Sequence, residues 1–365
     1  MPLVPPNIQA LVAYQPGRNA DDIRREFGIS RVIKLASNEN PMGPSPKAVA
    51  RIGTILDDIH LYPDGGQKLR QELANRFRVK IGNVVVGSGS EAIMANVIRT
   101  FLCDDEEVLT AEGTFIGFYV LARSRGVKLV TVPLKDYHYD LDAIAAAITP
   151  KTKIIYLANP NNPTGTIFSS SEFDAFMTRV PEHCLVILDE AYFEYAQDIP
   201  DYPDSMKYRL DNVITLRTFS KAYGLAGMRI GYGFAHEELC DNVRKVKLPF
   251  EPSVAAEAAG LGALEDHDFL AKTLDVNRKG KEFLSAALKD LGLNVTPTAA
   301  NFFLVALGSE AEAMQLYTDL LRRGVIIRPL KAFGIPNGLR ITVGTPDQNA
   351  VLVNALKAAL PVQHA

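Results

Sequence analysis

The sequence predicts an α/β fold in two parts, a large domain with a parallel or mixed sheet and a smaller α/β lobe. Up to Pro252, short β-branched runs alternate with helical patterns, which is typical of a sheet with helices on both faces. After Pro252 the pattern changes to long helical stretches and a few short strands. The chain has 365 residues, more than one typical domain of ~100 to 200 residues, so a large domain with an appended lobe is expected.

Seven strands are expected in the large domain, each a short run rich in β-branched residues. These runs are Asn83–Val86, Glu107–Ala111, Lys128–Pro133, Lys153–Ala158, Leu185–Asp189, Val213–Leu216 and Ile230–Phe234. Between the fourth and fifth runs, Ser169 and Glu172 have the spacing of a capping box. We expect them to open a helix that ends near Val180, just before Pro181.

The smaller lobe is expected to follow as helices, short strands and a closing helix. The helices are expected at Ser253–Leu264, Phe269–Leu291 and Asp347–Leu360, and the strands at Asn301–Val305, Val325–Arg328 and Leu339–Val343. The loop Asn40–Pro46, which prolines and a glycine interrupt, is expected to link an N-terminal arm to the large domain. We therefore assign residues 34–255 to the large domain, and residues 1–33 and 256–365 to the small domain with its N-terminal arm.

The composition favours a small molecule as the partner. The chain has 39 Lys+Arg and 42 Asp+Glu, a net charge of -3, and no basic run, so neither nucleic acid nor an anionic membrane is expected to bind. Cys103, Cys184 and Cys240 are far apart in the sequence and lie in apolar segments, which is typical of free thiols in a reducing compartment. Met1–Gln15 has no basic leader and no stretch of ~18 apolar residues occurs, so we expect a cytoplasmic protein. No metal is expected, because none of the six histidines lies in a motif or at metal-ligand spacing.

Lys221 is the residue best placed for covalent chemistry. It lies in the run Thr218–Gly224 (TFSKAYG), after the apolar stretch Val213–Leu216, and Arg229 follows eight residues on. Partial desolvation there would disfavour the ammonium form and lower the pKa, as an amine that forms a Schiff base with a carbonyl requires. The alternative is a lysine that merely ends a strand.

An anion site is expected at the turn Gly87–Glu91 (GSGSE), between a strand and the helical run Ala92–Phe101. Backbone amides and a serine hydroxyl would point outward from a helix N-terminus there. A tight turn without a ligand is the alternative, and the full dinucleotide fingerprint lacks its third glycine. Together with Thr218, Ser220 and Arg229, the turn is expected to hold a phosphate.

Two further strand ends carry polar groups that suit a ring-shaped ligand. The loop Asn159–Gly165 (NPNNPTG) projects asparagine amides from a rigid backbone at a strand's carboxyl end, where ligands bind in open α/β sheets, although a plain turn is the alternative. Asp189 ends another apolar strand, and a buried carboxylate needs a partner such as a protonated ring nitrogen. Tyr192, three residues later, would hydrogen-bond a phenolate oxygen on the same ring. Either residue alone could be a structural cap or a core tyrosine, and the paired spacing favours a site.

The motifs NPNNPTG, DEAY and SKAYGLAGMR, in this order, resemble the fold type I pyridoxal-phosphate (PLP) aminotransferases. The segments ASNENPMGPSP, YPDGG and LRITVG look like the histidinol-phosphate aminotransferase branch. The resemblance covers essentially the whole chain. It implies the PLP-dependent transferase fold type I, with a mostly parallel seven-stranded sheet, and a homodimer whose subunits share active sites.

The resemblance also implies a role for each motif residue. Lys221 would bond to the coenzyme and later move a proton between it and the substrate, and Asp189 would pair with the pyridinium nitrogen. Asn162 and Tyr192 would hold the 3′ oxygen of the ring, and Phe115 would stack on its face. The residues implied around the phosphate are Gly89, Ser90, Glu91, Thr218, Ser220 and Arg229, with Tyr62 from the other subunit.

For the substrates, Arg340 matches the superfamily's carboxylate-binding arginine, which also serves 2-oxoglutarate and glutamate. Arg328 and Tyr14 match positions that help to bind the phosphate of histidinol phosphate in this branch. Two arginines near one pocket suit a substrate with a dianionic tail better than one with a carboxylate. The alternative for Arg328 is an ion pair within the lobe. The chain departs from the branch at Ala92, where a second acid is common, and at Gly113, where proline is common.

The function expected from the resemblance is transamination of L-histidinol phosphate with 2-oxoglutarate, giving imidazole acetol phosphate and glutamate, in histidine biosynthesis. An aromatic amino-acid aminotransferase or a threonine-phosphate decarboxylase of the same fold is the close alternative. Alternatives from another class are a binding module without turnover and a nucleotide-binding protein that uses the Gly-Ser-Gly turn. Lys221 with Asp189 argues against both, because a scaffold does not need a desolvated lysine opposite a buried carboxylate.

Overall fold

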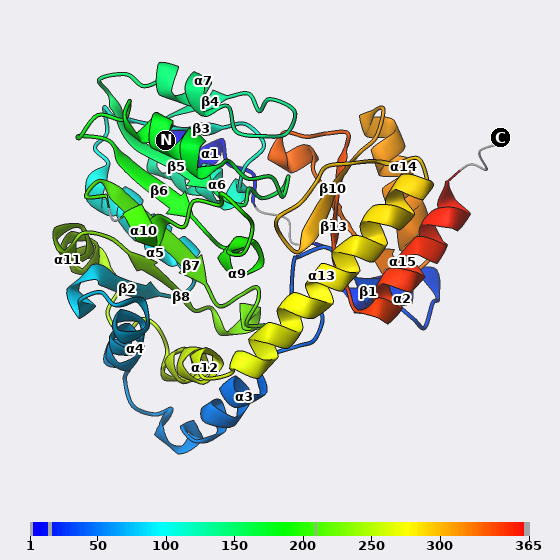
Figure 1. Cartoon of the computed structure of the whole chain (residues 1–365), viewed down its shortest axis with the longest axis horizontal. Helices are drawn as coiled ribbons and strands as arrows, with labels where there is room; N and C mark the ends of the chain where they lie inside the picture. Colours follow the sequence, from blue (N-terminus) through cyan, green and yellow to red (C-terminus); the bar gives the residue numbers. More distant parts are fainter. Residues whose placement is uncertain (1–2, 14–16, 209, 361–365) are drawn as a thin grey trace.

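A computed structural model describes residues 3–13, 17–208 and 210–360 of the chain. The large domain is built on a seven-stranded sheet in the order β2-β8-β7-β6-β5-β3-β4 (Figure 1). Strands β7, β6, β5, β3 and β4 run parallel, and β8 is antiparallel to both of its neighbours, β7 and β2. The expected mostly parallel seven-stranded sheet is confirmed.

The strands of this sheet are β2 (Val84–Gly87), β3 (Glu107–Ala111), β4 (Lys128–Val132), β5 (Thr152–Ala158), β6 (Leu185–Asp189), β7 (Val213–Thr218) and β8 (Gly231–Phe234). The helices of the same part of the chain are α3 (Pro46–Gly53), α4 (Gln67–Phe77), α5 (Ser90–Phe101), α6 (Ile116–Arg125), α7 (Leu141–Ala146), α8 (Ser170–Met177), α9 (Phe193–Ala196), α10 (Ser205–Tyr208), α11 (Glu237–Val246) and α12 (Val254–Leu264). The expected capping box of Ser169 and Glu172 is present at the start of α8.

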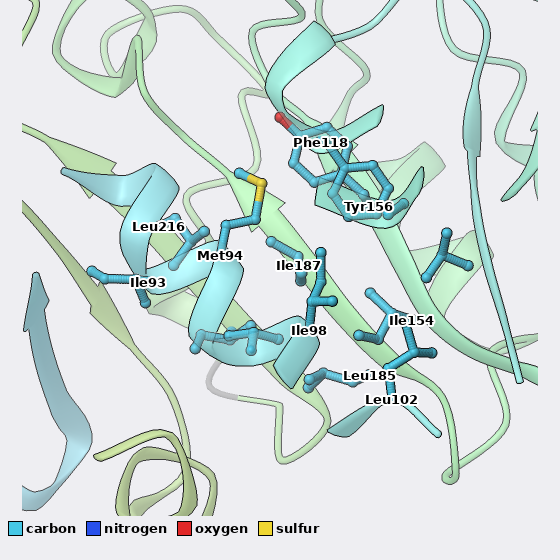
Figure 2. Close-up of a cluster of buried hydrophobic side chains, with 14 of the residues drawn as sticks. Ile93, Met94, Ile98, Leu102, Phe118, Ile154, Tyr156, Leu185, Ile187 and Leu216 are labelled. Atoms are coloured by element: carbon cyan, nitrogen blue, oxygen red, sulfur yellow. The ribbon is translucent and has the colours of Figure 1, made fainter. Parts of the chain in front are cut away.

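The central strands are apolar because both faces of the sheet are buried. In β5, Ile154, Tyr156 and Ala158 belong to one apolar cluster, which α5 and α6 complete (Figure 2). Ile155 and Leu157 belong to a second cluster, which α7 and α8 complete on the opposite face. This alternation leaves mainly the strand ends and the following loops for polar, functional side chains.

The small lobe carries a four-stranded antiparallel sheet in the order β12-β13-β10-β9, and α13, α14 and α15 bury its apolar side chains (Figure 1). Its elements are α13 (His267–Asp290), β9 (Asn294–Val295), β10 (Phe302–Ala306), α14 (Glu310–Arg322), β11 (Val325–Ile326), β12 (Arg328–Pro329), β13 (Gly338–Thr342) and α15 (Pro346–Ala359). The lobe is α/β, as expected from the sequence.

The expected single strand Val325–Arg328 is wrong, because the segment forms two short strands with different partners. β11 pairs in parallel with β1 (Ile33–Lys34), whereas β12 pairs antiparallel with β13. Val325, Ile326 and Ile327 are all buried, so the segment lies in the core on both sides and the change of partner leaves no mark in its apolar pattern.

The N-terminal segment touches both parts of the molecule. Asn7 in α1 (Pro6–Gln9) donates its side-chain amide to the carbonyl of Ser124 in the large domain, at 2.9 Å. Ile23 in α2 (Ala20–Phe27) packs with Leu321 and Ile326 of the small lobe. None of the helices within residues 3–13, 17–208 and 210–360 is both long and apolar enough to cross a membrane.

Helix α12 lies on the large-domain sheet, and α13 runs from there into the small lobe (Figure 1). Ala256 and Ala259 of α12 share an apolar cluster with Val84 of β2 and Tyr232 of β8. The division at residues 255 and 256 stays a proposal, and this packing favours keeping α12 with the large domain.

Candidate active site

Two adjoining cavities lie at the carboxyl ends of β5, β6 and β7, where ligands bind in open α/β sheets. The inner cavity is bounded by the large domain. The outer cavity extends to the small lobe. Five residues line both cavities, which therefore form one site: Glu91, Phe115, Asn162, Tyr192 and Lys221. The expected residues that line the inner cavity are Ser90, Glu91, Phe115, Asn162, Asp189, Tyr192, Thr218, Ser220, Lys221 and Arg229.

Lys221 follows β7 and extends its side chain between the two cavities. Its Nζ donates to the backbone oxygen of Ser37 at 3.4 Å and lies 5.7 Å from the centroid of the Tyr192 ring. Burial lowers the pKa of this amine from 10.5 to about 8, and the positive charges of Arg340 and Arg229 add to the effect. The neutral, nucleophilic form is therefore populated near neutral pH.

Asp189 ends β6 and lies at the inner cavity, where it is 5% exposed. The hydroxyl of Tyr156 donates to its Oδ2 at 2.8 Å, and the backbone N–H of Ala191 donates to its Oδ1 at 3.2 Å. Burial raises the pKa of this carboxyl to about 6, against the lowering effect of the two hydrogen bonds. A cationic ligand group would stabilise the ionised carboxylate in this position.

A buried ion pair fixes the strand ends that carry Asp189 and Lys221. Glu190 accepts from Arg217 of β7 at 2.7 Å, and both side chains are fully buried. Arg217 also pairs with Asp204 at 2.9 Å. A buried ion pair is weak evidence for stability, but this one joins the residue after β6 to β7 beside the site.

The Tyr192 hydroxyl accepts a hydrogen bond of 2.8 Å from Nδ2 of Asn38. Asn38 has a left-handed φ of 55° and is 1% exposed. Thr342 of the small lobe donates its hydroxyl to Oδ1 of Asn38 at 3.0 Å, which sets the orientation of the amide. Because Asn38 occupies an acceptor position of the phenol oxygen, the proton of that hydroxyl remains for a ligand in the cavity.

The turn before α5 forms a cradle for an anion. Gly89 has a φ of +86°, and no side chain in the described part of the chain caps the helix, so the first backbone N–H groups remain for a ligand. A Cβ on Gly89 would lie 2.7 Å from a guanidinium nitrogen of Arg229, and a Cβ on Gly231 would lie 2.3 Å from the backbone nitrogen of Ser90. Glycine at both positions lets the helix N-terminus and the guanidinium converge.

Two hydroxyls complete this cradle. Thr218, the last residue of β7, donates to the hydroxyl of Ser220 at 3.0 Å. Both side chains line the inner cavity together with Arg229. Helix N–H groups, hydroxyls and a guanidinium are the donors that bind phosphate in proteins.

The outer cavity presents two arginines from one face of the small sheet. Arg328 of β12 lies directly opposite Arg340 of β13 in the antiparallel pair, and both side chains line the cavity. Arg340 donates to Oδ1 of Asn162 at 2.5 Å and to the backbone oxygen of Ala36 at 2.7 Å. Like charges directly opposite each other in a sheet are unfavourable, so an anion between them would stabilise this face.

The family model for aminotransferase class I and II matches residues 30–356. This chain belongs to the class I and II aminotransferases. The histidinol-phosphate aminotransferase of Anaeromyxobacter sp. (strain Fw109-5) is 44% identical to it over 360 residues, which cover 98% of both chains. The histidinol-phosphate aminotransferase of Brevibacillus brevis is also 44% identical, over 347 residues and 94% of both chains.

Solved structures agree with this family. The histidinol-phosphate aminotransferase from Sinorhizobium meliloti, in complex with pyridoxal-5′-phosphate, superimposes on this aminotransferase with a TM-score of 0.89, at 29% identity and over 98% of both chains. An aspartate aminotransferase from Thermus thermophilus with maleate gives a TM-score of 0.84 at 22% identity, a likeness of fold alone.

Among the described residues, one expected residue is not brought to the site of this aminotransferase chain. Tyr62 is 80% exposed and stacks on Phe250, with ring centroids 4.2 Å apart, and it lines neither cavity. Tyr14 lies outside the described residues.

Two residues of the aminotransferase site were not predicted from the sequence, Asn38 and Tyr156. Asn38 lies in the segment ASNENPMGPSP, where no local pattern shows that its amide reaches Tyr192. Tyr156 carries the one polar side-chain group among the last five residues of β5, two residues before the strand ends. Its position was the available signal, because Tyr156 lies on the same face of β5 as Ala158, the residue that pairs with Asp189 of β6.

Proposed function

We propose that this chain is a PLP-dependent aminotransferase that exchanges the amino group of L-histidinol phosphate with 2-oxoglutarate. The products are imidazole acetol phosphate and glutamate, in histidine biosynthesis. The observation that carries the proposal is one cavity in which Lys221, with its pKa lowered to about 8, lies between a buried carboxylate and an anion cradle. The 44% identity to histidinol-phosphate aminotransferases supports the donor.

The residues present fit PLP. Its phosphate suits the cradle of Gly89, Ser90, Glu91, Thr218, Ser220 and Arg229, which needs glycine at two positions to form. Its ring nitrogen suits Asp189. The two donors that bond to this carboxylate are neutral, and no cation is bonded to it in the described part of the chain. We assign the 3′ oxygen to Asn162 and Tyr192 and the ring face to Phe115, all of which line the cavity.

Once bound, PLP supplies an electron sink for the carbanion chemistry. The chain contributes binding, orientation and one movable proton. We assign the movement of that proton to Nζ of Lys221, which would accept it from the substrate carbon that bears the amine, pass it on to the coenzyme, and move it the opposite way in the reverse half-reaction. Tyr192, with Asn38 on its acceptor side, keeps a donor in a fixed position at the same cavity.

We assign the choice of substrate to the outer cavity. Arg328 and Arg340 present two guanidinium groups side by side, which suits the dianionic phosphate of the donor better than a single carboxylate. We assign Arg340 also to the carboxylates of 2-oxoglutarate and glutamate. Tyr14 is assigned to the donor phosphate from the resemblance alone.

We further propose a cytoplasmic homodimer in which Tyr62 reaches the phosphate cradle of the partner subunit. Tyr62 is exposed and stacks on the exposed Phe250, and further exposed apolar side chains lie close in sequence to both, as expected of a surface that another chain covers. These further side chains are Leu56, Ile59, Leu61 and Leu248. The three cysteines are free thiols, which suits a reducing compartment.

A half-reaction experiment tests the proposed donor. The protein is purified with PLP, and the visible band of coenzyme joined to Lys221 is identified by its loss on borohydride reduction. Histidinol phosphate, phenylalanine and threonine phosphate are then offered singly. Histidinol phosphate is expected to bleach the band fastest. Faster bleaching by phenylalanine would contradict the donor while leaving the family assignment intact.

Mixing two inactive variants tests the shared site. Lys221→Ala and Tyr62→Ala are expected to be nearly inactive alone. If Tyr62 acts in the neighbouring subunit, a mixed dimer contains one intact site, so random reassociation restores about a quarter of the wild-type activity. No recovery in dimers shown to exchange subunits would contradict the shared site.

A further inference from the structure

Tyr156 touches the carboxylate of the site and has no role in the resemblance. Its hydroxyl donates to Oδ2 of Asp189 at 2.8 Å, within normal hydrogen-bond length. The other oxygen of Asp189 accepts from the backbone of Ala191 at 3.2 Å. Each carboxylate oxygen thus has one neutral donor from the chain, and Tyr156 is the only one of the two that a mutation can remove.

The ring of Tyr156 is held rigidly. It is fully buried and stacks on Phe118 of α6, with centroids 4.3 Å apart and an angle of 10° between the rings (Figure 2). In the parallel pairing of β5 with β6, Tyr156 lies opposite Ile187, and Ala158 lies opposite Asp189. The side chains of Tyr156 and Asp189 therefore project from the same face of the sheet, on adjacent strands. Tyr156 is two residues before Ala158, the partner of Asp189, which places its hydroxyl beside the carboxylate.

The direction of this hydrogen bond is fixed by chemistry. Burial raises the pKa of Tyr156 well above its usual value, so the hydroxyl keeps its proton and can only donate to a carboxylate. The other titratable groups that act on Asp189 or respond to it are Tyr139, Glu190, Tyr192 and Lys221. Among them, none is hydrogen-bonded to the Asp189 side chain in the described residues.

We propose that Tyr156 is a positioning residue for Asp189, which holds the carboxylate in place and weakens its competition for the proton of the coenzyme's ring nitrogen. The inference rests on the proposed function, in which Asp189 meets that nitrogen. A hydrogen bond to a carboxylate stabilises its ionised form. The proton therefore stays on the ring, where it makes the ring the stronger electron sink.

The test compares Tyr156→Phe with Tyr119→Phe in the PLP-loaded protein. Tyr119 is a matched control, because its buried hydroxyl in the same apolar cluster donates to Ala111 at 2.6 Å and lines neither cavity. The coenzyme is labelled with ¹⁵N in its ring, and the nitrogen resonance reports protonation directly. Tyr156→Phe is expected to move this resonance toward that of an unprotonated pyridine, and to lower kcat about tenfold with KM of the donor unchanged.

Three results would overturn the inference in distinguishable ways. Failure of the wild-type protein to bind PLP would overturn the proposed function and this role with it. A protonated nitrogen in both wild type and a folded Tyr156→Phe would overturn only the role of Tyr156. Equal shifts in the Tyr156 and Tyr119 variants would show a general loosening of the cluster instead.

A second variant serves if Tyr156→Phe does not fold. Phe118→Leu keeps the hydroxyl but removes the ring on which Tyr156 stacks. A partial shift of the ¹⁵N resonance in the same direction is expected, and an unchanged resonance would count against the positioning role.

Discussion

Nη1 of Arg340 donates to Oδ1 of Asn162 at 2.5 Å, across the boundary between the small lobe and the large domain. The same guanidinium donates to Ala36 at 2.7 Å, and it lies against the rings of Phe302 and Phe333. A residue held on several sides is preorganised for an anionic partner, since little side-chain freedom is lost on binding.

Removal of this arginine should weaken the binding of the carboxylate substrates. Arg340→Ala loses charge-assisted hydrogen bonds, each worth ~1.5 to 3 kcal/mol, so KM for glutamate is expected to rise about 10- to 100-fold. Arg278→Ala is the control, because Arg278 forms only exposed pairs on α13 among those described. Steady-state kinetics with glutamate as donor measures the effect. A KM within about twofold of wild type would contradict the assignment.

Lys221 should titrate near pH 8 in the coenzyme-free protein. Burial lowers its pKa from 10.5 to about 8, so between these values the amine is neutral where an exposed lysine is charged. The rate at which PLP combines with the protein should therefore rise with pH and level off above about 8. Stopped-flow absorbance across this range measures it, and a rate still rising at pH 10 would contradict the lowered pKa.

Replacement of the same lysine should nearly abolish turnover. Lys221→Ala removes the proposed base, and the loss is expected to be at least about 10²- to 10⁴-fold in kcat. Lys281→Ala is a matched control, because burial also lowers the pKa of Lys281 but its side chain lines neither cavity. Activity of the control close to wild type would separate a chemical role from a general effect of losing a desolvated lysine.

Gly231 should be required for coenzyme affinity. A Cβ there would lie 2.3 Å from the nitrogen of Ser90, so Gly231→Ala must displace the N-terminus of α5. We expect the dissociation constant for PLP to rise about tenfold or more, in line with ~1 to 3 kcal/mol for overpacking. Gly227→Ala, with no atom within 4 Å of its added Cβ, is the control. Fluorescence titration of coenzyme-free protein decides between them, and equal affinities would contradict the cradle.

Arg328 should discriminate the two donors. Arg328→Ala is expected to raise KM for histidinol phosphate about 10- to 100-fold, because a phosphate contact is lost, and KM for glutamate by less than about threefold. The two KM values are measured on the same preparation. Equal effects on both donors would count against a phosphate role and favour a general contribution to the lobe.

The large sheet and the inner cavity were predictable from the sequence because their signals are local. The motif that contains Lys221 and the strand that ends at Asp189 each combine an apolar run with polar residues at its end, and the sheet brings such ends together. The hydrogen bond from Asn38 to Tyr192 joins residues 154 positions apart and has no local signature. The break between β11 and β12 was also hidden, because Val325–Ile327 is apolar throughout and its change of partner depends on tertiary packing.

Asp189 should make the coenzyme-free protein less stable as pH rises. Burial raises the pKa of its carboxyl from 3.8 to about 6, so between these values the folded chain binds more protons than the unfolded chain. The stability that this carboxyl contributes to the folded chain is then present at low pH and is lost as pH rises through 6. Asp189→Asn removes this dependence.

The stability gain of Asp189→Asn over wild type is expected to grow by roughly 1 to 3 kcal/mol between pH 4 and pH 7.5. Comparing the same two proteins at two pH values cancels the effect of the altered hydrogen bonds on the stability difference. It also cancels the effect of the raised pKa values of Glu190 and Glu194, because both proteins retain these residues. Urea unfolding of coenzyme-free protein measures the difference, with the exposed Asp198→Asn as control. With PLP bound, wild type is expected to be more stable than Asp189→Asn, because only the carboxylate can pair with a protonated ring nitrogen. A variant that is more stable than wild type both with and without PLP would contradict that pairing.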